Sequence, residues 1–370
     1  MGLAPEKLGM RPLKPLGIGM TISSQNSPLR VAIFGAGSIG CYVGGRLAAG
    51  GAQVTFIGRE RYQSVLQQHG LTLTHFAKEK AYVPPEMFDF VTNSSGLAAV
   101  DVVLVCVKSQ DSATAGAEIA QHAPKDALVI SLQNGVSNPP QLRSSAPDAH
   151  VLGGVVPFNV TSPTDGRFHA GTEGDLIIEA SEDERLQALL DVFHTAEQGA
   201  RMVPDILALQ WGKLLINLNN GMNTLHGGTL KSGLLNRDYR LALRDMTAEA
   251  LDILTLEGVS PQGFTGVTPA KLLRILGLPN WLYKIIMDRV IKIDAAARSS
   301  MLDDLDMGRI SEIDYLQGEV VRLAKKHGRT ASINARMIEA VNAAFTAGAS
   351  PKMTGREIRA MLGDRGKDDV

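Results

Sequence analysis

Residues 29–40 read Leu29-Arg30-Val31-Ala32-Ile33-Phe34-Gly35-Ala36-Gly37-Ser38-Ile39-Gly40, and this stretch decides the fold. The first six residues are mainly apolar and include two β-branched side chains, which predicts a buried strand. The last six form a Gly-x-Gly-x-x-Gly motif that opens a segment of helical character, residues 38–49. A glycine loop joining a strand directly to a helix is typical of a dinucleotide site. The stretch therefore predicts the start of a Rossmann-like domain.

Each glycine of the motif has a physical role in such a site. Gly35 allows the tight turn, Gly37 lets the backbone approach a pyrophosphate, and Gly40 lets the helix pack closely on the strand. The exposed N–H groups and the positive end of the helix would hold the phosphates. The alternative is a turn that binds nothing, since glycines often serve turns alone.

Further apolar runs alternate with segments of helical character until about residue 200. They predict strands at 52–57, 101–107, 127–132, 151–156 and 175–179. Strands alternating with helices predict a parallel, doubly wound sheet with right-handed crossovers. After residue 205, long amphipathic patterns predict helices at 206–224, 237–257, 311–327 and 332–347. The fold class is therefore α/β, with a Rossmann-like N-terminal domain followed by an all-α C-terminal domain.

Composition excludes several classes of protein. The 370 residues carry a net charge of −1, so no large uniform field attracts nucleic acid or an anionic membrane. No window carries the long uncharged apolar run of a membrane span, and the first nineteen residues do not form a secretory signal. Cys41 and Cys106 are too few for a disulfide framework or a metal set. We expect a cytoplasmic protein without a metal ion.

The residues after the second predicted strand indicate which dinucleotide binds. NAD sites place an acidic residue there for the ribose hydroxyls. Here the sequence is Ile57-Gly58-Arg59-Glu60-Arg61. The guanidinium of Arg59 matches a phosphate in charge and geometry, which favours the 2′-phosphate of NADPH. A solvated Arg59 is the alternative, and Glu60 next to it would lessen the selectivity if it held a ribose hydroxyl.

These patterns divide the chain into four parts. Residues 1–28 are expected to be a disordered or non-native leader, since a natural start near Met20 precedes the first strand closely. Residues 29–203 form the NADP-binding Rossmann-like domain, and residues 204–362 form the helical substrate and catalytic domain. Residues 363–370 are a charged, frayed tail.

Two polar residues follow predicted strands at the edge where open parallel sheets bind ligands. Lys108 places an ammonium after residues 101–107, and Asn134 places an amide after residues 127–132. Asn134-Gly135 is also a common turn sequence, so Asn134 alone does not separate a turn from a site.

Lys213, Asn217 and Asn220 are spaced four and three residues apart, so they share one face of a helix. Burial among apolar neighbours would lower the pKa of Lys213 and let it donate a proton near neutral pH. The alternative is a lysine whose ammonium extends out to solvent.

A second polar group follows in Ser299-Ser300-Met301-Leu302-Asp303-Asp304 and Ser311-Glu312-Ile313-Asp314-Tyr315. Ser311 and Asp314 have the spacing of a helix capping box, and Glu312 suits the first turn of the same helix. A structural role and a catalytic one for Glu312 are both open on local grounds. Ser299 and Ser300 also suit a loop or a helix cap.

Taken in order, these motifs resemble the ketopantoate reductases, over about residues 30–345. The motifs are Gly35–Gly40, Lys108, Gln133-Asn134-Gly135, Trp211-Gly212-Lys213-Leu214, Ser299-Ser300-Met301-Leu302 and Glu312-Ile313-Asp314-Tyr315. The resemblance implies an NADP-dependent oxidoreductase of a CH–OH group. It implies a cleft between the two domains, in which NADPH reduces 2-dehydropantoate to pantoate on the route to pantothenate.

The resemblance also implies roles by position. Lys213 is the general acid that protonates the new alkoxide, and Glu312 holds the substrate hydroxyl and orients Lys213. The other implied positions are at the substrate, Asn217, Asn220, Ser300, Asp304 and Asn134, and at the cofactor, Gly35–Gly40, Arg59, Lys108 and Asn134.

Departures from the family pattern leave the exact 2-oxo acid open. Gly221 stands where the family often has a second asparagine, and Ala297 and Arg298 stand where an asparagine is common. Another NAD(P)-dependent reductase or dehydrogenase of a 2-oxo or 2-hydroxy acid is the alternative. A non-catalytic NADPH-binding regulator is disfavoured by the presence of both Lys213 and Glu312. A homodimer is compatible with the resemblance.

Overall fold

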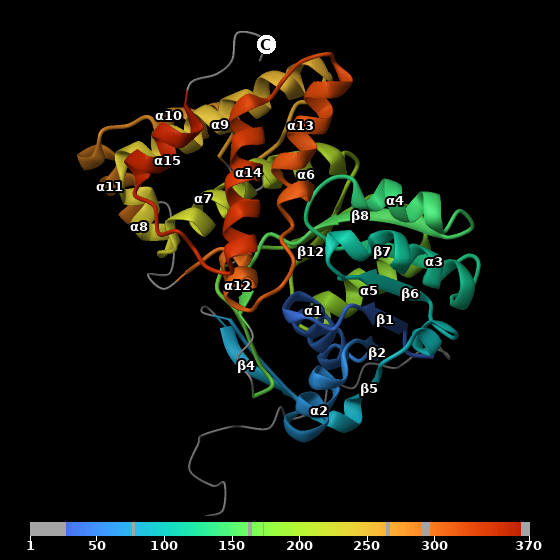
Figure 1. Ribbon diagram of the computed structural model, residues 1–370. Coiled ribbons are helices and arrows are strands. Elements are labelled where there is room, and N and C mark those ends of the chain that lie inside the picture. The colour runs from blue at the N-terminus through green and yellow to red at the C-terminus, as the bar shows by residue number, and fades with distance from the viewer. Residues whose placement is uncertain are drawn as a thin grey trace, which may run out of the picture.

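The computed structural model describes residues 27–75, 78–161, 165–172, 174–263, 267–289 and 297–363. Figure 1 shows a lower part built on a twisted sheet and an upper part built of helices. The leader up to residue 26 and the tail from residue 364 lie outside the described residues.

An eight-stranded sheet forms the centre of the lower part, in the order β12-β11-β8-β7-β6-β1-β2-β5. All neighbouring strands are parallel except β8 and β11, which are antiparallel. The strands span β1 Arg30–Phe34, β2 Gln53–Ile57, β5 Phe88–Val91, β6 Val102–Val105, β7 Leu128–Ser131, β8 His150–Val155, β11 Leu176–Glu179 and β12 Ala200–Val203. The predicted sheet is thus present, with β5 and β12 as additional edge strands.

Helices cover both faces of this sheet because alternate strand residues point to opposite faces. In β1, Val31 and Ile33 join one hydrophobic cluster, whereas Ala32 between them joins another. The helices of the first face are α1 Ser38–Ala49 and α5 Glu184–Thr195, and those of the second are α3 Ser112–His122 and α4 Asn138–Ser145. Both faces are covered, which explains why β6 and β7 are apolar along their whole length.

A smaller sheet packs beside α1, in the order β4-β3-β10-β9. Its strands are β3 Leu71–His75, β4 Lys78–Val83, β9 Val160–Thr161 and β10 Arg167–Ala170. Leu71, Leu73 and Phe168 extend the first hydrophobic cluster into it. The sequence analysis did not predict this sheet.

The upper part is helical and begins at Ile206, directly after β12 ends at Val203. Its helices are α6 Ile206–Asn217, α7 Asn219–His226, α8 Leu230–Leu235, α9 Arg237–Leu256, α10 Pro269–Leu276, α11 Asn280–Arg289, α12 Ser300–Asp306, α13 Gln317–Lys326, α14 Ser332–Ala347 and α15 Gly355–Leu362. The long helix α9 lies centrally and packs against α8, α10, α13, α14 and α15. One hydrophobic cluster joins these helices.

Two expected helices are broken in the structure. The helix predicted at 206–224 is two helices, α6 and α7, that meet at Leu218. The carbonyl of Leu218 accepts a hydrogen bond from the side chain of Gln317 at 2.8 Å, so this carbonyl has a partner outside the helix.

The helix predicted at 311–327 is a 3₁₀ turn at Ile313–Tyr315 followed by α13. The expected capping box is wrong, because Ser311 accepts from the N–H of Ile313, two residues on, and no α-helix begins there. Glu312 consequently stands before the 3₁₀ turn rather than within the first turn of a long helix.

The described residues were also compared with the requirements of a membrane span, a metal site and a disulfide. Over the described ranges, no helix combines the length and apolarity needed to cross a membrane. In the same part of the chain, no group of three His, Cys, Asp or Glu residues is placed to hold a metal ion. Cys41 and Cys106 are both free, and burial raises the pKa of the Cys106 thiol to about 12.

Candidate active site

The glycine loop between β1 and α1 is shaped by close packing at two of its three glycines. Gly35 has φ +111°, and a Cβ there would lie 2.5 Å from the backbone nitrogen of Val107. A Cβ on Gly40 would lie 2.2 Å from the carbonyl oxygen of Gly35. Around Gly37, in contrast, no heavy atom lies within 4 Å of such a Cβ. The loop is therefore tight where it meets the protein and open at Gly37.

The backbone beside this opening leaves donors free for a ligand. The N–H groups of Gly35 and Ala36 both donate to the carbonyl of Ile57 at 3.0 Å, which fixes the loop against β2. Helix α1 begins at Ser38 without a side-chain cap, and the first N–H groups of a helix have no partner within it. No acceptor in the described part of the chain takes the N–H groups of Ser38 and Ile39, which are therefore available to an anion. This geometry fits the pyrophosphate of a dinucleotide.

Arg59 lies next to the same loop. Gly58 packs so closely on Ala36 that a Cβ on Gly58 would lie 2.6 Å from the Ala36 Cβ. Arg59 follows as the residue before α2 (Glu60–His69), and its side chain is exposed. Within the described part of the chain, its guanidinium has no hydrogen bond or ion pair. Glu60 is also exposed, in the first turn of α2.

A cluster of charges joins the sheet part to the helical part. Lys108, after β6, donates to Asp304 on α12 at 2.6 Å and to Glu312 at 2.8 Å. Ser109 holds the other oxygen of Glu312 with its backbone N–H at 3.0 Å and its hydroxyl at 2.9 Å. Arg309 reaches the second oxygen of Asp304 at 3.2 Å. Both carboxylates are buried and each accepts from two residues.

These contacts determine the charges of the cluster. Burial opposes the charge of Glu312, but Lys108 and the donors of Ser109 outweigh it, so the pKa of Glu312 lies below its usual value. Burial opposes the charge of Lys108 as well, and the nearby Glu312 and Asp304 raise the pKa of Lys108 above its usual value. Glu312 is therefore an anion and Lys108 a cation at neutral pH.

Lys213 lies on α6 and differs from Lys108 in having no partner. Its side chain is partly buried, and within the described residues its ammonium forms no hydrogen bond or ion pair. Burial lowers the pKa of Lys213 to about 8, while the charge of Glu312 acts in the opposite direction. At pH 7 most molecules therefore keep the proton on Lys213, held loosely enough to be donated.

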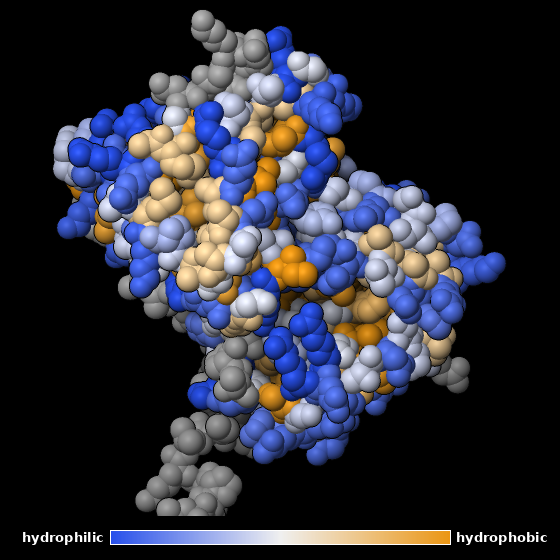
Figure 2. All heavy atoms as spheres, in the orientation of Figure 1, coloured by the Kyte–Doolittle hydropathy of each residue, from blue (hydrophilic) through white to orange (hydrophobic). Residues whose placement is uncertain are grey.

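Two predicted amides meet across the interface. The side chain of Asn217, on α6, donates to the side-chain oxygen of Asn134 at 3.4 Å. The backbone carbonyl of Asn134 accepts from the hydroxyl of Ser109 at 3.4 Å. The structure thus brings Asn134, Asn217 and the Glu312 cluster together. Figure 2 shows hydrophobic side chains gathered where the two parts of the molecule meet, with hydrophilic ones around them.

Other predicted residues lie elsewhere or make other contacts. Ser300 is the exposed first residue of α12, whereas Ser299 caps that helix by accepting from the N–H of Leu302 at 3.2 Å. Asn220 is partly buried and its carbonyl accepts from the Ser299 hydroxyl at 3.4 Å. Asp304, expected beside the substrate, is bound by Lys108, and Lys108, expected at the cofactor, is bound by two carboxylates.

Sequence reasoning missed three residues that build this region. Ser109 holds Glu312, Arg309 shares Asp304 with Lys108, and the buried Asn223 accepts from the N–H of Ser299 at 2.9 Å. Ser109 follows Lys108 directly at the end of a strand, so its position was a usable signal. For Arg309 and Asn223 the sequence offers no local signal.

Comparison with known families agrees with this geometry on both sides of the interface. Residues 31–183 match the family described as Ketopantoate reductase PanE/ApbA, and residues 205–345 match Ketopantoate reductase PanE/ApbA C terminal. The two matches cover most of the chain. The chain belongs to the ketopantoate reductase family. The family comprises oxidoreductases that act on a CH–OH group.

Individual members of the ketopantoate reductase family are distant but extend over nearly the whole chain. A 2-dehydropantoate 2-reductase of Halobacterium salinarum is 26% identical over 308 residues, which are 81% of this chain and 93% of the relative. A crystal structure of a PanE/ApbA family ketopantoate reductase from Ralstonia eutropha JMP134 is 27% identical, with a TM-score of 0.74. The superposition covers 86% of this chain and 99% of that one.

A second solved structure shares the fold at lower identity. D-mandelate dehydrogenase with NADH and anilino(oxo)acetate has a TM-score of 0.72 at 19% identity, covering 86% of this chain and 99% of that one. At this identity the likeness concerns the fold alone.

The departures from the ketopantoate reductase pattern are explained by packing. A Cβ on Gly221 would lie 3.2 Å from atoms of Gln317, Ile313 and Met337, so this position faces the helical core. Arg298 forms ion pairs with Asp303 and Asp306 on the adjacent helix α12. Its guanidinium is thus already engaged by two carboxylates.

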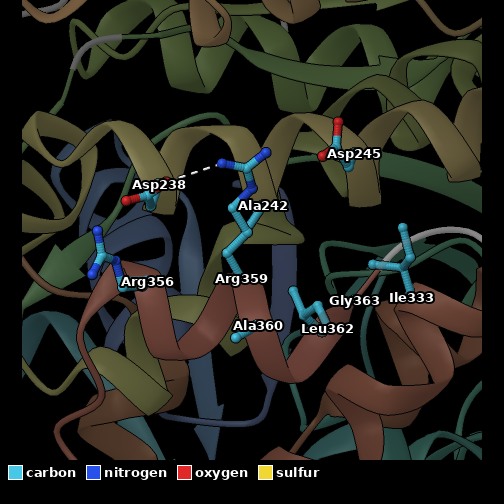
Figure 3. Close-up of a pocket in the computed structure, with 9 residues that line it drawn as sticks. All are labelled: Asp238, Ala242, Asp245, Ile333, Arg356, Arg359, Ala360, Leu362 and Gly363. Carbon is cyan, nitrogen blue, oxygen red and sulfur yellow. Dashed lines mark hydrogen bonds and ion pairs between the residues drawn. The ribbon is translucent and has the colours of Figure 1, made fainter.

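A cavity of about 390 Å³ lies in the helical part, between α9 and α15. Figure 3 shows the side chains around it, including the ion pair of Arg359 with Asp238 at 3.0 Å. None of the residues predicted for cofactor, substrate or catalysis lines it. The cavity is separate from the site at the interface.

Proposed function

We propose that this protein reduces 2-dehydropantoate to pantoate with NADPH, and that Lys213 is the general acid. The single observation that carries the assignment is the state of Lys213. Its ammonium has no hydrogen bond or ion pair within the described residues, and its pKa is about 8, under the influence of the charge of Glu312. Lys213 belongs to α6, the helix whose Asn217 meets Asn134 at the interface. Membership of the ketopantoate reductase family supports the substrate.

The residues of the chain supply binding, orientation and a proton. The bound dinucleotide supplies the hydride to the ketone carbon. Negative charge then develops on the ketone oxygen, and the ammonium of Lys213 stabilises this charge and transfers a proton from Nζ to the oxygen. We assign the orientation of the substrate oxygens to Asn134, Asn217, Asn220 and Ser300.

Glu312 has a different task from the one that the resemblance implies. Lys108 and Ser109 engage both of its oxygens, so Glu312 acts on Lys213 mainly through its charge. A nearby anion favours the protonated form of an amine. Glu312 therefore keeps the proton on Lys213 against the effect of burial.

The preference for NADPH rests on Arg59. Its guanidinium is free within the described residues and lies beside the glycine loop, where a 2′-phosphate would be matched in charge and shape. Glu60 next to it suits a ribose hydroxyl, and we expect NADH to be accepted more weakly.

A second candidate function is the reduction of another 2-oxo acid on the same scaffold. The fold is compatible with it, since D-mandelate dehydrogenase shares this fold. A panel of 2-oxo acids assayed with NADPH separates the two, with 2-dehydropantoate beside 2-oxoisovalerate, pyruvate and phenylglyoxylate. We expect the highest kcat/KM for 2-dehydropantoate. A different acid ahead by more than about tenfold, about 1.4 kcal/mol, would establish the second function instead.

A further inference from the structure

Lys108 occupies an unusual place for a residue expected at a cofactor. It extends from the sheet part into the helical part and lies between two buried carboxylates, Asp304 and Glu312. The side chains of these acids are 4% and 10% exposed, whereas that of Lys108 is 33% exposed. Removal of one partner from a buried ion pair leaves a buried charge without compensation, which is costly.

In the described part of the chain, the cluster contains two carboxylates and two cations in direct contact. Among the described residues, Glu312 forms an ion pair with Lys108, and its charge also acts on Lys213 without a hydrogen bond or ion pair between the two side chains. Asp304 faces Lys108 and Arg309 by contact, and Asp303 lies close by on α12. Of these charged groups, Glu312 is the one whose charge raises the pKa of Lys213.

We propose that Lys108 is a positioning residue: it holds Glu312 on the sheet side of the interface and screens its charge from Lys213, and thereby controls how readily Lys213 releases its proton. This inference rests on the proposed function only because it takes Lys213 as the acid. The position of Lys108 between Asp304 and Glu312 rests on its own ion pairs. The same cation would thus act on the reaction without touching substrate or cofactor.

The physical consequence of losing this cation has a definite sign. Without Lys108, Glu312 keeps, within the described residues, the two donors of Ser109 and has no cation in contact, while its charge still acts on Lys213. An opposite charge that is no longer compensated stabilises an ammonium and raises its pKa, and the pKa of Lys213 should therefore rise.

The test is an NMR titration of the Lys213 side chain in the full-length, cofactor-free protein, with Lys213→Ala to assign the signal. In Lys108→Met we expect the pKa of Lys213 to rise by about one unit or more. Lys108→Gln, which keeps donors but no charge, should give the same rise and replaces Lys108→Met if that variant does not fold. Lys108→Arg, which keeps the cation, should leave the value nearly unchanged.

Two controls separate screening from a general disturbance. Arg309→Gln removes the other cation on Asp304 but makes no contact with Glu312, so the pKa of Lys213 should stay unchanged. In a Glu312→Gln background, Lys108→Met should raise the pKa of Lys213 much less, because the carboxylate to be screened is gone. An equal rise with and without Glu312 would overturn the proposal.

Turnover and titration report on different claims. If Lys108→Met leaves the pKa of Lys213 unchanged or lowers it, while weakening NADPH binding, Lys108 is a cofactor ligand and the proposal is wrong. If the pKa rises as expected but the wild-type protein reduces none of the 2-oxo acids, the screening role stands and the proposed function fails.

Discussion

The glycine loop at residues 35–40 and the charge cluster around Glu312 serve one site but are built in opposite ways. In the loop, six consecutive residues carry the motif, and the backbone contacts that shape it come from neighbouring strands of one sheet. In the cluster, Lys108 meets Asp304 and Glu312 from 196 and 204 residues away. A motif of adjacent residues can be predicted from the sequence. A cluster that forms between two distant parts of the chain is seen only in the structure.

Within the loop, the largest expected effect is a difference in stability between substitutions at Gly35 and at Gly37. Gly35→Ala forces a Cβ into positive φ and onto the backbone of Val107, so we expect a loss of about 3 kcal/mol or more in the free energy of unfolding. Gly37→Ala meets open space and should cost less than about 1 kcal/mol, while weakening NADPH binding at least about tenfold. Urea unfolding and fluorescence titration with NADPH measure the two effects. Equal destabilisation by both substitutions would contradict the packing described for the loop.

The next effect concerns the stability cost of Lys213. A folded pKa of about 8 against the usual 10.5 means that folding disfavours the ammonium, by about 3 kcal/mol before its partial exposure is considered. Lys213→Met should therefore stabilise the protein by about 2 kcal/mol at pH 7. The penalty is complete below about pH 8 and disappears as the pH rises towards 10.5, so the gain should shrink over that range. Urea unfolding at pH 7 and pH 10 checks this, and a gain independent of pH would rule out desolvation as its cause.

A somewhat smaller effect is expected at the edge of the loop. Arg59→Ala should raise KM for NADPH about tenfold or more, because a charge-assisted contact with the 2′-phosphate is lost, and should change KM for NADH less than about twofold. Arg61, an exposed arginine two residues further on in the first turn of α2, provides the matched control, and Arg61→Ala should leave both constants unchanged. Equal increases in KM for NADPH and NADH would show that Arg59 does not bind the 2′-phosphate.

The pH dependence of turnover tests the other region. Only the protonated form of Lys213 donates, so kcat for reduction should be level below pH 8 and fall about tenfold per unit above it. In the oxidative direction the neutral amine is required, and kcat should rise through the same range. A reduction rate that is flat to pH 10 would mean that another group supplies the proton.

The sequence predicted the elements whose signal is local. The run 29–34, the glycine motif and the apolar runs at 101–107 and 127–132 all became strands and turns of the main sheet. The smaller sheet was missed because its strands are short and because β3 pairs with β10, which lies far along the chain. The alternation of apolar and polar residues in β3 was a usable strand signal. The expected single helix at 206–224 is interrupted at Leu218, whose carbonyl accepts a hydrogen bond from the distant Gln317, a contact that no local pattern encodes.

For the candidate site, the sequence predicted which residues take part but not the contacts between them. Lys213, Asn217, Asn134 and Glu312 were singled out by spacing and resemblance, and the structure brings them to one interface. The partners of Lys108 depend on how α12 and the turn after it pack against the sheet, which no local pattern encodes. Likewise, no local pattern showed that Gly221, which stands where the family often has a second asparagine, faces Gln317 and Met337 in the core.

The most direct test of the central claim compares binding and turnover in Lys213→Ala. The glycine loop and Arg59 are untouched by this change, so NADPH should bind with an affinity within about threefold of the wild type, whereas kcat for 2-dehydropantoate should fall by about 10²- to 10⁴-fold. Unchanged turnover with normal NADPH binding would contradict the assignment of Lys213 as the proton donor.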